Sequence, residues 1–126
     1  MSKSPHPTDG EMAILRVLWR CGPSTVRAVH DEVQKQRTIG YTTVLKMLQI
    51  MLEKGIVLRE EASRPHVYRP AQPPEQIQEG LVEALARKAF GGSAASLVMR
   101  ALSAKTTSRD ELREIRELLD SLAGEE

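Results

Sequence analysis

The sequence predicts a mainly α-helical chain with one small β-hairpin. Apolar residues make up 40% of the 126 residues, yet the aromatic residues are only one Trp, two Tyr and one Phe. The core is therefore mostly aliphatic, which favours the packing of helices. Apolar residues recur at helical spacing on both sides of a proline-rich segment, residues 70–74. This segment indicates a boundary between two domains, residues 1–74 and 75–126.

Two helices are expected near the N-terminus. Thr8 and Glu11 have the T-x-x-E spacing of a capping box, and apolar residues at helical spacing follow them up to position 19. A Gly-Pro pair at positions 22–23 ends this first helix. Ser24 then stands where the N-cap of a second helix is expected, because its hydroxyl can accept a hydrogen bond from a free amide of the first turn.

A third helix and a hairpin complete the first domain. The helix runs from about Thr42 to Lys54, and Gly55 follows where a left-handed residue commonly ends a helix. Two short β-prone runs, residues 56–60 and 66–69, are separated by five residues, as in a hairpin. Three helices followed by a hairpin is the order of a winged helix-turn-helix, and we predict that fold for residues 1–74.

The second domain is expected to be a helical dimerisation domain. Helical stretches cover residues 75–90 and 93–104, and Ser108 with Glu111 forms a second capping box before the last helix. This last helix carries apolar residues at spacings of three, four and three, which match a seam for a partner helix: Leu112, Ile115, Leu119 and Leu122. In the alternative interpretation, the stripe packs back onto the first domain.

Composition and motifs exclude several classes of protein. Cys21 is the single cysteine, so a disulfide within the chain or a cluster of thiolates is excluded. The three histidines, His6, His30 and His66, lack metal-ligand neighbours at useful spacing. Because no nucleotide-binding, hydrolase or zinc-protease motif occurs, we expect neither an enzyme nor a cofactor. No apolar run approaches the roughly 20 residues of a membrane span, and no signal peptide is visible, so we expect a cytoplasmic protein.

The distribution of charge favours DNA as a partner. Residues 1–74 carry eleven Lys and Arg against seven Asp and Glu, whereas residues 75–126 carry seven against ten. The candidate base-reading side chains lie off the apolar stripe of the third helix: Thr42, Thr43, Lys46 and Gln49. The candidate phosphate contacts are basic residues around that helix and on the hairpin: Arg27, Lys35, Arg37, Arg64 and Arg69. The alternative is a winged-helix protein–protein interaction module that binds no DNA.

Several segments resemble the BlaI/MecI penicillinase-repressor family. They are residues 8–19 (TDGEMAILRVLW), 21–26 (CGPSTV), 41–48 (YTTVLKML), 53–55 (EKG), 67–70 (VYRP), 91–93 (GGS) and the helix with ELREIRELL. The resemblance covers roughly residues 7–122. It implies a winged-helix DNA-binding domain and a helical dimerisation domain in a homodimeric transcriptional repressor. Such repressors bind palindromic operators with TACA/TGTA-type half-sites, and many are paired with a membrane sensor metallopeptidase.

The resemblance also implies release from DNA by cleavage in the dimerisation domain. The cleavable bond is expected near Arg100 and Ala101, although these two residues differ from the usual pair. Gly91 and Gly92 form a local weak point between two helices, because glycine lowers the cost of opening the backbone. Ile50 stands where a basic residue is expected near the end of the third helix. The cysteine-rich C-terminal motif of the copper-responsive branch is absent from this sequence.

Overall fold

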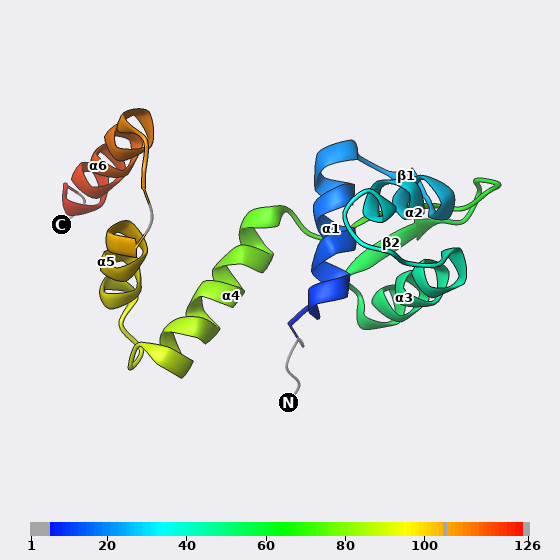
Figure 1. Cartoon of the computed structure of the whole chain (residues 1–126), viewed down its shortest axis with the longest axis horizontal. Coiled ribbons are helices and arrows are strands. Elements are labelled where there is room, and N and C mark those ends of the chain that lie inside the picture. The colour runs from blue at the N-terminus through cyan, green and yellow to red at the C-terminus, as the bar shows by residue number, and fades with distance from the viewer. Residues whose placement is uncertain (1–5, 105, 125–126) are drawn as a thin grey trace. The chain divides into compact units, whose positions relative to one another are not determined.

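The computed structural model describes residues 6–104 and 106–124, which form six helices and three strands (Figure 1). In chain order the elements are α1 Asp9–Cys21, β1 Ser24–Thr25, α2 Val26–Gln34, α3 Tyr41–Lys54, β2 Val57–Glu60, β3 Val67–Pro70, α4 Pro74–Ala89, α5 Ala94–Ala104 and α6 Arg109–Ala123. The predicted fold class, mainly helical with a small hairpin, is confirmed. The chain divides into two compact units, Met1–Leu81 and Val82–Glu126.

Helix α1 begins with the predicted capping box. The Thr8 hydroxyl oxygen accepts a hydrogen bond from the Glu11 amide at 3.1 Å, and the Glu11 carboxylate accepts one from the Thr8 amide at 3.0 Å. Glu11 is only 5% exposed, and both of its carboxylate oxygens also accept hydrogen bonds from Lys54 Nζ, at 2.9 and 3.1 Å. This buried ion pair joins the first turn of α1 to the last turn of α3.

The predicted N-cap of α2 is wrong by one residue. Thr25, and not Ser24, caps the helix, because its Oγ1 accepts the Ala28 amide at 3.1 Å. Ser24 is instead buried in strand β1, where it pairs with Tyr68, and its hydroxyl donates to the Gly22 carbonyl at 2.8 Å. Pairing with β3 holds Ser24 in the sheet, so the helix starts after the next residue.

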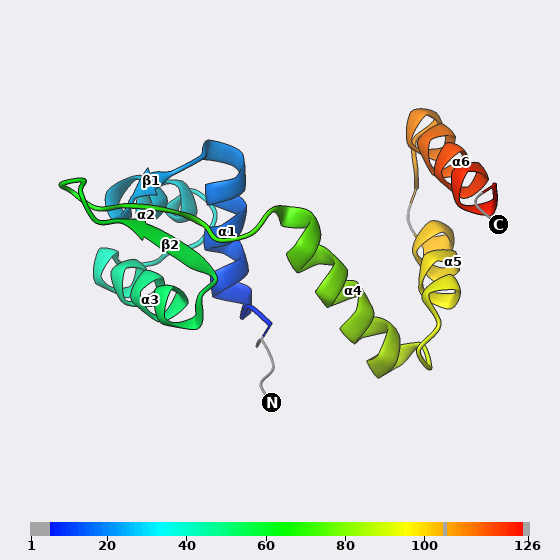
Figure 2. The same ribbon diagram turned by 180° about the vertical axis from the view of Figure 1, so that it is seen from behind.

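The three strands form an antiparallel sheet in the order β1-β3-β2. Opposite Cα positions pair Arg59 with Tyr68 and Leu58 with Arg69. Because side chains alternate between the two faces of a strand, Val57 and Tyr68 share the buried face while Leu58 and Arg69 share the exposed one. The hairpin loop between β2 and β3 projects beyond the helices in both views (Figures 1 and 2).

The core of the first unit is aliphatic, as the composition predicts, apart from one fully buried tyrosine, Tyr68. The α3 residues Val44, Leu48 and Met51 are completely buried and meet side chains of α1, α2 and β2. Gly55 ends α3 in the predicted left-handed conformation, with φ 80°. One face of α3 is therefore fixed against the core, and the opposite face is presented to solvent.

The second unit has almost no core of its own. In the described part of α4, α5 and α6, Ala86 is the single buried residue. The predicted capping box of α6 is present, since the Glu111 amide donates to Ser108 Oγ at 3.0 Å. The helices nevertheless leave large apolar side chains exposed: Val82, Leu85, Val98, Met99, Leu102, Leu112, Leu118, Leu119 and Leu122.

Candidate nucleic-acid interface

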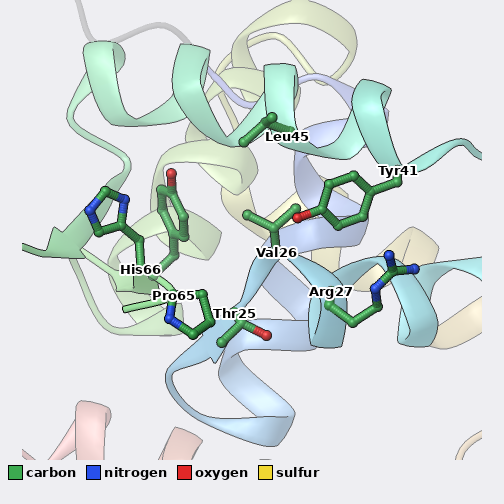
Figure 3. Close-up of a pocket in the computed structure, with 8 residues that line it drawn as sticks. Thr25, Val26, Arg27, Tyr41, Leu45, Pro65 and His66 are labelled. Atoms are coloured by element: carbon green, nitrogen blue, oxygen red, sulfur yellow. The ribbon is translucent and has the colours of Figure 1, made fainter. Parts of the chain in front are cut away.

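Helices α2 and α3 begin beside the hairpin and enclose with it a cavity of about 300 Å³ (Figure 3). Its walls combine one guanidinium and one imidazole with hydroxyl groups and apolar groups: Thr25, Val26, Arg27, Tyr41, Leu45, Pro65, His66 and Tyr68. The N-cap of α3, Gly40, provides no side-chain hydrogen bond to the first turn. The free amides and the positive end of the α3 dipole favour an anion at this edge.

A chain of contacts connects α2 to the start of α3. The Arg27 guanidinium carbon lies 4.6 Å from the centre of the Tyr41 ring, and this ring meets the His30 ring edge-on at 6.1 Å. His30 Nε2 donates a hydrogen bond to the Ile39 carbonyl at 3.1 Å, and Nδ1 lies 3.0 Å from an Asp31 carboxylate oxygen. The turn between α2 and α3 is thus held from inside, and the Arg27 charge lies beside the first residue of α3.

The four candidate base-reading residues all lie on the exposed side of α3. Thr42 and Thr43 occupy its first turn, while Lys46 and Gln49 follow one and two turns later, and each side chain is exposed. Ile50, on the same helix, is 38% exposed. Hydroxyl, ammonium and amide groups are the kinds of group that read base edges in a major groove.

Of the three candidate phosphate contacts on or just after α2, one lies at the cavity. Arg27 lines it, whereas Lys35 and Arg37 follow the other end of the helix. Lys35 Nζ forms an ion pair with Glu32 at 3.0 Å, and Arg37 lines a groove between α1 and α2. Hydrogen bonds from Lys35, and next from Arg20, hold the pKa of Glu32 below its usual range. The structure therefore separates Lys35 and Arg37 from Arg27.

On the hairpin, the two candidate arginines have different surroundings. Arg64 Nη1 donates to the backbone carbonyls of Glu61 and Ser63, at 2.6 and 2.7 Å, so this side chain shapes the loop. Arg69 is exposed on the outer face of the sheet. A further arginine, Arg59, points to the inner face beside Tyr68 and binds the Glu61 carboxylate, with Nε to Oε2 at 2.9 Å. Arg59 was not predicted as a site residue, although it stands two positions after the buried Val57 and so shares the inner face of β2.

The described residues contain no group of three or more His, Cys, Asp or Glu side chains that could hold a metal ion. Across residues 6–104 and 106–124, no helix is both long enough and apolar enough to cross a membrane. Cys21 is a free, exposed thiol.

In the second unit, the candidate dimerisation stripe lies on one side of α6. Leu112, Leu119 and Leu122 are 43%, 58% and 54% exposed, and Ile115 is half-buried in a hollow beside Leu102. The candidate cleavage residues lie in two places. Gly91 and Gly92 adopt positive φ angles of 60° and 84° between α4 and α5. Arg100 and Ala101 are exposed within α5.

Comparison with known proteins shows which family has this architecture. The penicillinase repressor family matches residues 7–121. The transcriptional regulator BlaI of Mycobacterium tuberculosis is 38% identical over 95 residues, which cover 74% of this chain and 69% of that protein. The penicillinase repressor of Bacillus licheniformis is 24% identical over 120 residues, covering 95% and 94% of the two chains.

A solved structure agrees with these relatives. It is the solution structure of the monomeric form of Bacillus licheniformis BlaI in complex with the blaP half-operator. It matches 60% of this chain and 92% of its own, with a TM-score of 0.51 and 27% identity. The winged helix-turn-helix and the non-enzymatic nature predicted from the sequence are both confirmed by these relatives. The chain therefore belongs to the penicillinase repressor family of BlaI/MecI-type transcriptional regulators.

Proposed function

We propose that the chain is a homodimeric repressor that binds a palindromic operator with TACA/TGTA-type half-sites in the cytoplasm. The observation that carries this proposal is the polar face of α3, next to an uncapped helix N-terminus and a hairpin. It is supported by the relative whose structure was solved with a half-operator, because that structure matches more than half of this chain at 27% identity. In this proposal, α3 enters the major groove and the hairpin acts as the wing.

The roles of individual residues follow from where they lie on this face. Thr42 and Thr43 approach the DNA closely because they are short and stand in the first turn of α3, and Lys46 and Gln49 reach base edges deeper in the groove. Five basic residues contact phosphates: Arg27, Lys35, Arg37, Arg64 and Arg69. For Arg27 the role is supported by its place beside Tyr41 at the start of α3.

The same proposal assigns DNA binding to residues 1–74 and dimerisation to residues 75–126. The second domain holds two copies together through the apolar stripe of α6: Leu112, Ile115, Leu119 and Leu122. The support is physical. Leucines that are about half exposed leave apolar surface in contact with water, and a partner helix that covers them removes this unfavourable contact. When two DNA-binding domains are joined in one dimer, binding of the second half-site becomes an intramolecular step, which raises the affinity for the whole operator.

Release from DNA is proposed to follow the separation of the two copies. A cut near Gly91 and Gly92, or within α5 at Arg100 and Ala101, detaches α6 from the rest of the chain and removes the seam. A membrane sensor metallopeptidase that acts indirectly is the proposed source of this signal. The exposure of all four residues supports access by a protease.

Salt-dependent DNA binding tests the function. The full-length chain is titrated into a labelled duplex that carries the TACA/TGTA palindrome and into a scrambled duplex, and fluorescence anisotropy is recorded from low to physiological salt. We expect tighter binding to the palindrome and a steep loss of affinity for both duplexes as salt rises. Equal, weak and salt-insensitive signals on the two duplexes would contradict the proposal and favour a protein–protein interaction module.

A further inference from the structure

Two arginines and one histidine of the hairpin lie against the same residue, Glu61. Its carboxylate accepts two hydrogen bonds from Arg59, from Nε at 2.9 Å and from Nη2 at 3.4 Å. His66 Nε2 lies 4.0 Å from the same carboxylate, on the oxygen that faces Arg59 Nη2. The backbone carbonyl oxygen of Glu61 accepts a hydrogen bond from Arg64 Nη1 at 2.6 Å. The Arg59 charge is therefore directed onto the chain's own acid, whereas Arg69 stays exposed on the outer face of the sheet.

The donors around Glu61 have the arrangement of an oxyanion site. An arginine that offers two parallel N–H groups matches a phosphate as well as a carboxylate. Arg59 is held in place because it stands opposite Tyr68 on the inner face of the sheet, and its side chain is only 26% exposed. His66 lines the cavity at the start of α2 and α3, and its Nε2 is buried without a hydrogen-bond partner in the described part of the chain. The Glu61 oxygen, 4.0 Å away, is too far to accept a hydrogen bond from this nitrogen, and a phosphate oxygen that came closer would accept one.

We propose that Arg59 and His66 form a phosphate-binding site of the wing, and that the Glu61 carboxylate is its internal occupant. Glu61 then competes with a phosphate of the DNA backbone and lowers the affinity that the wing contributes. The inference rests on the proposed function, since the phosphate belongs to the bound duplex. Exchange is feasible because Glu61 is 68% exposed, and ion pairs at such exposure are weak.

In the free protein, Arg59 and Glu61 each stabilise the ionised form of the other. The hydrogen bond from Arg59 holds the pKa of Glu61 below its usual range, and the bond to Glu61 raises the pKa of Arg59. Both groups therefore stay charged at neutral pH, so the competition operates under the conditions in which DNA is bound. Removing the carboxylate charge should leave Arg59 available to a phosphate.

Glu61→Gln tests the inference, and Glu60→Gln is its matched control. Both variants change the net charge of neighbouring residues by the same amount, but Glu60 makes no ion pair or side-chain hydrogen bond within the described residues and lies on the outer face. On the palindromic and scrambled duplexes, we expect E61Q to bind about two- to fivefold more tightly at low salt. The slope of log affinity against log salt should steepen by about 0.9, because one more phosphate is neutralised.

A double variant distinguishes direct competition from a general charge effect. Glu61→Gln on the Arg59→Gln background should give no more gain than Glu60→Gln, because the side chain that it frees is missing. A gain of equal size in E60Q, or a full gain of E61Q without Arg59, would overturn the inference while leaving DNA binding by the wild-type chain intact. Failure of the wild-type chain to bind either duplex would instead overturn the proposed function, and the inference with it.

Discussion

The buried ion pair between Glu11 and Lys54 leads to a sharp prediction about stability. Lys54→Met keeps most of the apolar stem of the side chain but removes the ammonium group, which lies 2.9 and 3.1 Å from the two Glu11 oxygens. Glu11 is 5% exposed, so its carboxylate would lose its ionic partner in a site that water reaches poorly. Loss of one partner of a fully buried pair costs roughly 3–5 kcal/mol.

The cost should be smaller here because the Lys54 side chain is 27% exposed and the Thr8 amide still donates to Glu11. We therefore expect Lys54→Met to lower the free energy of unfolding of the first unit by about 2 kcal/mol. Lys35→Met is the matched control, since Lys35 pairs with Glu32 but its side chain is 68% exposed. That variant should cost less than about 1 kcal/mol.

Urea unfolding followed by tryptophan fluorescence measures both changes. Trp19 is the single tryptophan of the chain, and it packs against the core of the first unit, so its emission reports the unfolding of that unit. With a typical slope of about 1–2 kcal/mol per M of urea, the midpoint for Lys54→Met should fall by about 1–2 M. Glu11→Gln on this background should recover part of the loss. Equal midpoints for Lys54→Met and Lys35→Met would refute the reasoning.

Three further predictions concern DNA binding and assembly. Lys46→Ala should cost about 1–3 kcal/mol of binding free energy on the palindrome and much less on the scrambled duplex in anisotropy titrations. Equal losses on the two duplexes would show that Lys46 contacts a phosphate and no base. Leu119→Asp should yield monomers in sedimentation, because a charge would enter the proposed seam, while Arg113→Asp, on the side of α6 away from the seam, serves as a charge control expected to remain dimeric. Limited proteolysis should cut first around Gly91 or in the segment 70–74, and mass spectra with a first cut inside residues 8–69 would contradict this.

Local rules predict the helices of this chain well. The capping boxes at Thr8 and Ser108 and the left-handed Gly55 lie where the sequence places them, because each depends on residues within four positions of the helix end. Strand β1 was beyond such rules. Its two residues take their conformation from pairing with β3, more than 40 positions along the chain, and this pairing also moved the N-cap from Ser24 to Thr25.

The candidate site shows the same limit. The exposed side of α3 follows from helical periodicity alone, so Thr42 and Lys46 could be assigned to it without a structure. The surroundings of the arginines could not be predicted, because they depend on the fold of the hairpin and on which end of α2 meets α3. Arg59 was missed and Arg64 is engaged by the loop backbone, since both arrangements arise from contacts within the hairpin.

Strand β1 also affects how the protein meets a ligand as rigid as duplex DNA. Thr25 belongs to two elements at once, since it pairs with Val67 of β3 and caps the first turn of α2. Strand β1 therefore runs into α2 with no loop residue between them, and its pairing with β3 ties the wing to the start of that helix. Contact surfaces that are fixed relative to each other before docking lose little conformational entropy, so more of their contact energy remains as affinity.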